Sequence, residues 1–131
     1  SIQFAAEFHG WEAWANFPKE RERFISLVRE EKASGVILLS GDMHYGEISV
    51  LRENVPYPIY DFTSSGINRV WEHQMENIHR LGDTEYRSHI GWINIDWEQP
   101  DPKIRLSLET QQGISSVQHT ISLSEITFNT P

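Results

Sequence analysis

The chain has 131 residues, with 11 Lys and Arg against 19 Asp and Glu, which gives a formal net charge of −8. This acidity disfavours a nucleic-acid-binding surface and favours a bound cation as the receptor for any anionic ligand. The chain contains no cysteine, so disulfides and thiolate metal sites are excluded. Its length is that of a single domain, and no apolar run reaches the ~18 residues of a membrane-spanning helix.

The first twenty residues combine a short strand pattern with an unusually aromatic loop. Residues 2–6 are apolar enough to predict a strand. The loop that follows contains Trp11, Trp14 and Phe17. Such rings either cap a hydrophobic core or wall a binding site, and the sequence leaves both interpretations open.

An amphipathic helix that leads into a buried strand is predicted next. Pro18 occupies the first turn, apolar residues follow at helical spacing, and Gly35 is expected to end the helix. The uninterrupted apolar run over residues 36–40 predicts a fully buried strand. A helix directly before such a strand indicates an α/β layer.

The second half is dominated by antiparallel strand patterns. Residues 70–85 are poorly patterned and predict an irregular excursion, whereas residues 125–131 predict a frayed tail. The fold class expected for residues 1–131 is α/β, a single domain with a mixed sheet and a mainly antiparallel second half. Strands are expected at 48–51, 57–63, 90–97, 103–108 and 117–123, of which 90–97 and 103–108 form a β-hairpin.

The sequence Gly41-Asp42-Met43-His44 follows the apolar run and presents a carboxylate and an imidazole two residues apart. Alternate residues share a face, so both side chains are expected to converge beyond the strand end, where α/β sheets bind ligands. Two donors are too few for a complete metal site. The alternative is a turn in which Asp42 caps backbone amides and His44 is a surface histidine. Glu47 is expected to begin an exposed strand.

Three blocks of sequence together resemble a known enzyme family. They cover residues 14–21 (Trp-Ala-Asn-Phe-Pro-Lys-Glu-Arg), 35–47 (Gly-Val-Ile-Leu-Leu-Ser-Gly-Asp-Met-His-Tyr-Gly-Glu) and 57–66 (Tyr-Pro-Ile-Tyr-Asp-Phe-Thr-Ser-Ser-Gly). In order and spacing they resemble the C-terminal part of alkaline phosphatase D-like metallophosphatases, which belong to the calcineurin-like metallophosphoesterase superfamily. The resemblance extends over roughly residues 1–110 and also includes Asn77 and Arg80.

The resemblance implies the C-terminal portion of a four-layer α/β/β/α sandwich with a two-metal centre that hydrolyses phosphomonoesters or phosphodiesters. Gly41-Asp42-Met43-His44 is similar to the last metal motif of the superfamily, Gly-His-x-His. Asp42 and His44 would then each bind one of two divalent or trivalent ions, among Ca, Fe, Mn or Zn, which bind phosphate oxygens and activate water. By position, Tyr45 and Arg69 are expected to contact the phosphate.

The earlier ligand motifs of the superfamily do not occur in this chain. The resemblance therefore implies about the last third of an enzyme, whose partners are a phosphoester substrate and the N-terminal part of the same domain. We expect the isolated chain to be inactive and to bind metal weakly, and the full enzyme to be periplasmic or extracellular. One rival is a non-catalytic β-rich interaction module with an aromatic partner-binding loop. Another is a fold that is stable only when packed against a missing half or a partner chain.

Overall fold

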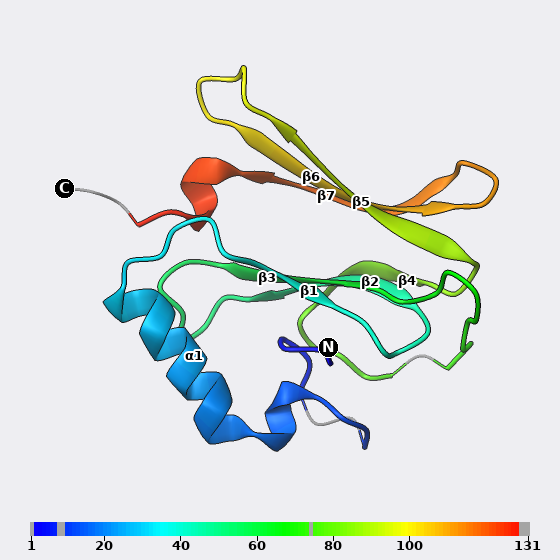
Figure 1. Ribbon diagram of the computed structural model, residues 1–131, viewed down its shortest axis with the longest axis horizontal. Helices are drawn as coiled ribbons and strands as arrows, with labels where there is room; N and C mark the ends of the chain where they lie inside the picture. Colours follow the sequence, from blue (N-terminus) through cyan, green and yellow to red (C-terminus); the bar gives the residue numbers. More distant parts are fainter. Residues whose placement is uncertain (1, 8–9, 74, 129–131) are drawn as a thin grey trace.

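The computed structural model describes residues 2–7, 10–73 and 75–128, which fold into two sheets and one α-helix (Figure 1). Strands of both directions and a helix place the fold in the α/β class, as the sequence predicts. The elements are η1 (Trp14–Asn16), α1 (Pro18–Glu30), β1 (Ile37–Ser40), β2 (Gly46–Leu51), β3 (Ile59–Ser64), β4 (Arg80–Glu85), β5 (His89–Asp96), β6 (Lys103–Thr110), β7 (Ser115–Ser122) and η2 (Leu123–Ile126).

The first sheet is mixed and has the strand order β1-β3-β2-β4. β1 runs parallel to β3, and β2 runs antiparallel to both β3 and β4. Leu39 and Ile48 both lie opposite Phe62 in the register, so these three residues share one face. Residues on alternate positions, such as Glu47 and Asp61, share the other face.

The second sheet is an antiparallel meander with the order β5-β6-β7, and it packs as a second layer on the first sheet (Figure 1). The predicted hairpin is confirmed as β5 and β6, and the predicted last strand is confirmed as β7. Apolar side chains of β6 and β7 face the first sheet and form the core with residues such as Ile48 and Phe62. The opposite face of the first sheet is covered by α1 and the N-terminal segment, where Phe24 packs edge-on against Phe4.

Three expectations for the first forty residues were wrong. Residues 2–6 form no strand but a single bridge between Gln3 and Ala13. The helix ends at Glu30 rather than at Gly35, because Lys32 already adopts a left-handed backbone with φ of 49°. The strand predicted to be fully buried has Leu39 60% exposed, because β1 lies at the edge of the first sheet.

Two expectations for the second half also differ from the structure. The segment predicted to be irregular contains β4, which pairs with β2 across a register shift. The segment predicted to fray holds Ile126, which is fully buried and accepts a hydrogen bond from the Gly35 amide at 2.8 Å. Phe128 packs edge-on against Tyr57, and residues 129–131 lie outside the described part of the chain.

Candidate functional site

The loop between β1 and β2 carries the predicted metal motif in an uncommon backbone conformation. Asp42 and His44 have φ angles of 75° and 56°, in the left-handed region that non-glycine residues enter infrequently. The loop is held in place by the segment after β3. The Trp71 amide donates to the His44 carbonyl at 2.9 Å, and the Ser65 hydroxyl donates to the Tyr45 carbonyl at 3.0 Å. The surrounding contacts thus fix a loop that its own residues would not favour.

The side chains of residues 42–44 differ in their exposure to solvent. Met43 is 4% exposed and anchors the loop, while Asp42 is exposed and His44 is half-buried. Among the described residues, neither side chain has a hydrogen bond or an ion pair, so the capping role considered for Asp42 is not observed. The strand alternation used to place both on one face does not apply, because both lie in a turn beyond the end of β1.

A metal ion would find suitable donors here but an incomplete set. Carboxylate oxygen and imidazole nitrogen are both ordinary metal ligands. Within the described ranges, however, no group of three or more His, Asp or Glu side chains is arranged to hold a metal ion. Asp42 and His44 therefore fit two positions of a metal centre by their chemistry, and the remaining positions need ligands from elsewhere.

The two predicted phosphate-contacting residues lie in different environments. Tyr45 is fully buried, its hydroxyl is 3.4 Å from the Gln3 amide oxygen, and burial raises its pKa far above the ordinary value. The structure thus gives no support to a direct contact between Tyr45 and a phosphate group. Arg69 is exposed and lies two residues before Trp71, which holds the His44 carbonyl.

A buried polar network lies directly behind the loop, centred on Glu47. The Glu47 side chain is fully buried, and its Oε2 is 2.5 Å from the Arg80 Nε. The side-chain amides of Gln3 and Asn77 each donate to Oε1 at 2.7 Å. The prediction that Glu47 begins an exposed strand was wrong, because Arg80 neutralises its charge and two amides satisfy its lone pairs. Sequence reasoning missed this network, whose members come from three separate parts of the chain, namely the N-terminal segment, β2 and residues 77–80.

A second buried carboxylate fixes the end of β1. Asp61 accepts hydrogen bonds from the Ser40 hydroxyl at 2.5 Å and from the Phe4 and Ala5 amides at 2.7 and 2.8 Å. Burial raises the pKa of Asp61, and these hydrogen bonds oppose the shift. Ser40 is the last residue of β1, so Asp61 positions the strand end from which the Asp42 turn departs.

Gly46 and Gly66 leave space for the imidazole ring of His89, a residue that the sequence did not single out. A Cβ at Gly46 would lie 2.6 Å from the His89 Nε2, and a Cβ at Gly66 would lie 2.4 Å from its Cε1. His89 is 3% exposed, its Nδ1 is 2.8 Å from the Arg87 carbonyl, and its Nε2 has no partner in the described part of the chain. The close approach locks the start of β5 against the first sheet.

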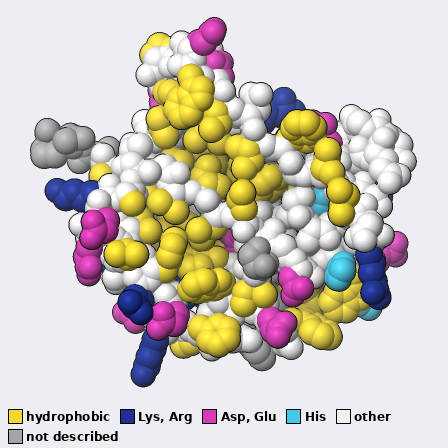
Figure 2. Space-filling model, in the orientation of Figure 1, with side chains coloured by type: hydrophobic (Ala, Val, Ile, Leu, Met, Phe, Trp, Pro, Cys, Tyr) yellow, Lys and Arg dark blue, Asp and Glu magenta, His cyan; other side chains and the backbone are white. Residues whose placement is uncertain are grey.

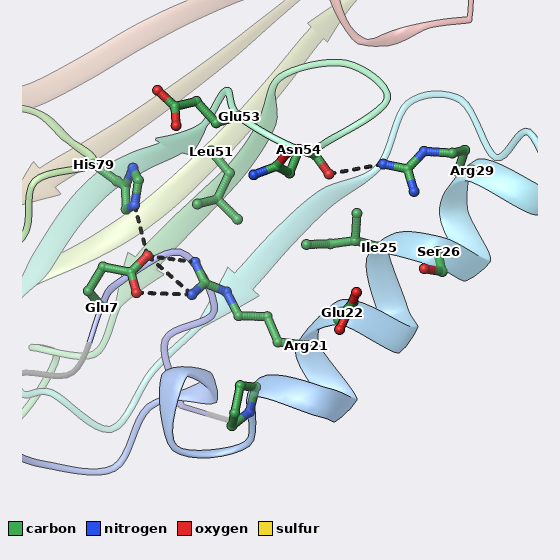
Figure 3. A pocket seen from close by; sticks show the side chains of 11 residues that line it. Glu7, Arg21, Glu22, Ile25, Ser26, Arg29, Leu51, Glu53, Asn54 and His79 are labelled. Atoms are coloured by element: carbon green, nitrogen blue, oxygen red, sulfur yellow. Dashed lines mark hydrogen bonds and ion pairs between the residues drawn. The ribbon is translucent and has the colours of Figure 1, made fainter.

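A hollow in the surface of the described residues is lined by residues other than those of the predicted motif. It has a volume of about 560 Å³ and lies between α1, the end of β2 and His79 (Figure 3). Inside it, Glu7 Oε1 is 3.2 Å from Arg21 and 3.1 Å from the His79 Nε2. These contacts outweigh partial burial and lower the pKa of Glu7. Neither Asp42 nor His44 lines this hollow, and its central charges already satisfy one another.

Comparison with protein-family models, with curated proteins and with solved structures found no match to this chain. In the part of the chain that the structure describes, no helix is long and apolar enough to cross a membrane. The features of the chain that bear on its function are therefore the Asp42 and His44 turn and its surroundings.

Proposed function

We propose that this chain is the C-terminal part of a metal-dependent phosphoester hydrolase of the alkaline phosphatase D-like type, in which Asp42 and His44 each bind one of two metal ions. The observation that carries the proposal is the conformation of their turn. Two metal-ligating side chains without other partners among the described residues occupy an uncommon backbone, and backbone strain of this kind concentrates at functional sites.

The surroundings of the turn support the proposal by giving it a rigid base. Asp61 fixes the end of β1, and the Glu47 network fixes the start of β2, so both ends of the loop are held. Preorganised ligands are what a catalytic metal site requires. The exposed Arg69 adds a cation for an anionic substrate beside this loop, and Tyr45 acts through packing.

The proposed centre is completed by residues outside this chain. Two divalent or trivalent ions, drawn from Ca, Fe, Mn or Zn, would supply Lewis acidity to the phosphoryl group when bound. The remaining ligands, and the outer layer of a four-layer α/β/β/α sandwich, would come from the N-terminal part of the same domain. The substrate would be a phosphomonoester or phosphodiester, and a periplasmic or extracellular location is part of the same proposal.

The experiment that tests this function uses the polypeptide extended by the residues encoded upstream. Hydrolysis of p-nitrophenyl phosphate and bis-p-nitrophenyl phosphate is measured with each candidate metal. Asp42→Ala and His44→Ala should each lose more activity than the roughly 10- to 100-fold that is typical when a residue that only hydrogen-bonds to a metal ligand is replaced. The matched controls are Asp83→Ala and His73→Ala, which replace exposed residues of the same types and should keep full activity. Full activity of both ligand variants would refute the proposal.

A second candidate is the interaction module with an aromatic binding loop. Trp11 and Phe17 are 55% and 57% exposed, which favours a surface role, although Trp11 packs edge-on against Trp71 with ring centroids 5.3 Å apart. Trp14 instead packs into the core against Phe4. The two candidate functions predict different effects of Asp42→Ala. The substitution abolishes the activity of a hydrolase, whereas it leaves partner binding by an interaction module unchanged.

A further inference from the structure

The turn at residues 42–44 meets two other segments at one end of the sheets, the segment after β3 and the start of β5 (Figure 1). The Ser65 amide and hydroxyl both donate to the Tyr45 carbonyl, at 3.3 and 3.0 Å. The His89 amide donates to the Gly66 carbonyl at 3.2 Å. The second sheet is therefore tied to the same segment that holds the turn.

The His89 ring lies between the two residues that follow the hydrogen-bonded pair of Tyr45 and Ser65. A Cβ added at Gly46 would lie 2.6 Å from the ring Nε2, and a Cβ added at Gly66 would lie 2.8 Å from the ring Nδ1. Contacts to carbon are most favourable at about 3.5–4.0 Å, so the edge of the ring occupies the space that the two missing side chains leave. The imidazole thus sets the spacing between the start of β2 and the segment after β3.

The segment after β3 makes a second contact with the turn. A Cβ at Gly66 would also lie 3.1 Å from the Val70 Cγ1, so Gly66 packs closely against both this side chain and the His89 ring. The next residue, Trp71, donates its amide to the His44 carbonyl at 2.9 Å. A displacement of the His89 ring would therefore be passed on to the backbone of His44.

The orientation of the His89 ring is fixed by a hydrogen bond of its own. Nδ1 is 2.8 Å from the Arg87 carbonyl, which can only accept, so Nδ1 carries the hydrogen. In the neutral ring Nε2 then holds a lone pair, and this buried atom has no partner among the described residues. Apolar side chains otherwise gather where the two sheets meet (Figure 2), and an apolar residue would leave no polar atom unpaired there. What the imidazole adds is the fixed direction of its ring.

We propose that His89 is a positioning residue for the metal ligands Asp42 and His44. Its imidazole, in the neutral Nδ1–H tautomer, holds the start of β2 and the segment after β3 at the spacing that lets Ser65 and Trp71 bond to the turn. This inference rests on the proposed function, because the turn needs a fixed geometry for catalysis only if its two side chains bind metal. Replacing residues that orient metal ligands typically costs roughly 10- to 100-fold in metal affinity or activity.

Nuclear magnetic resonance of the unsubstituted 131-residue chain tests this geometry directly. On the alkaline side of the histidine titration, the nitrogen chemical shifts of the His89 ring should report a protonated Nδ1 and an unprotonated Nε2. The ring Hε1 should show nuclear Overhauser contacts to the α-protons of both Gly46 and Gly66. An Nε2–H tautomer, or a ring without contacts to these glycines, would overturn the proposal.

His89→Asn separates positioning from general stability. The Asn amide reaches as far as the imidazole Nδ1 and keeps a donor for the Arg87 carbonyl, but it lacks the ring edge that lies between the glycines. Hydrogen exchange of the Ser65 and Trp71 amides should accelerate at least roughly 10-fold more than that of the β6 amides, which report global unfolding. The turn would then loosen without a matching loss of the whole fold.

The matched control is His119→Asn. His119 also lies between the sheets, but its Nε2 is 3.3 Å from the hydroxyl of Tyr60, which lies near the other end of β3. This substitution should change the exchange of all these amides by a common factor. If Ser65 and Trp71 also follow the β6 amides in His89→Asn, the proposal is refuted, because His89 would then contribute only to stability.

The metal dependence of hydrolysis separates this inference from the proposed function. In the polypeptide extended upstream, His89→Asn should need roughly 10- to 100-fold more free metal for half-maximal hydrolysis of bis-p-nitrophenyl phosphate, and His119→Asn should match the wild type. An extended wild type that hydrolyses no phosphoester contradicts the proposed function and leaves the exchange result standing. Equal metal dependence of an active wild type and His89→Asn contradicts the positioning role alone.

Discussion

The face of the first sheet under α1 and the edge formed by β1 and β5 show opposite relations between polarity and burial. On the closed face Glu47, a carboxylate, is fully buried, whereas on the open edge Leu39 is 60% exposed. The buried charge is satisfied by Arg80, Gln3 and Asn77. The apolar surface of Leu39 stays in contact with water. Burying such surface would stabilise the fold by about 25 cal/mol per Å². In this fold, burial therefore follows the partners available at each position rather than the polarity of the side chain alone.

The largest expected effect comes from breaking the closed face at its centre. Glu47→Gln keeps the shape of the side chain but leaves the Arg80 guanidinium, which is 11% exposed, without its counter-charge. The free energy of unfolding should fall by about 3–5 kcal/mol, as for other buried pairs that lose one partner. Urea denaturation measures the change. The control is Glu20→Gln, whose pair with Arg23 is exposed and should contribute about 0.5 kcal/mol or less. Equal stability of the two variants would contradict the account of the closed face.

The contact between the sheets can be broken at Gly66. Gly66→Ala places a Cβ about 2.4 Å from the His89 ring and should destabilise the fold by about 1–3 kcal/mol through overpacking. The double variant Gly66→Ala with His89→Ala removes the ring that clashes. Thermal unfolding of the single and double variants should therefore show strong coupling. Purely additive effects would show that the ring and the glycine do not meet.

Acid unfolding tests the ion pair between Glu85, at the end of β4, and Arg87. Hydrogen bonds from Arg87 lower the pKa of Glu85 from 4.5 to about 2, against the opposing effect of burial. Its folded pKa lies below the unfolded value, so its contribution is present above about pH 4.5 and is lost as the pH falls towards 2. Glu85→Gln should flatten the decline of Tm over this range. Parallel Tm curves for wild type and variant would exclude this role for Glu85.

The smallest effect is expected in the hollow beside α1. Glu7→Gln removes one partner of Arg21 and His79, but the Glu7 side chain is 50% exposed and solvent screens the pair. The loss should be about 0.2–1 kcal/mol at low salt and less at high salt. Denaturation at two salt concentrations measures it. A loss as large as that of Glu47→Gln would show that the hollow, rather than the closed face, stabilises the fold.

Most of the fold was predictable because its elements carry their own periodicity. The β5–β6 hairpin alternates in sequence, and Pro18 marks the start of α1. β4 was not predictable, since Arg-Leu-Gly-Asp-Thr-Glu has no alternation and the strand depends on pairing with β2. The exposure of Leu39 was equally hidden, because it depends on whether the second sheet covers β1.

The turn that carries the candidate site was predictable from the sequence, and its backbone conformation and contacts were not. Glycines around Asp42 and His44 indicate a turn with two possible ligands. The contacts that hold that turn come from Trp71 and Ser65, and the ring that needs Gly46 comes from His89. These partners lie far along the chain, and no local pattern links them to the motif.

The claim that the Asp42 and His44 turn belongs to a larger metal-binding domain is tested most directly by metal content. The upstream-extended polypeptide is dialysed, and its bound metal is measured by mass spectrometry for wild type, Asp42→Ala, His44→Ala and the control Asp83→Ala. The account predicts about two ions per chain in wild type and control, with loss in both ligand variants. Equal metal content in all four proteins, or none in wild type, would contradict it.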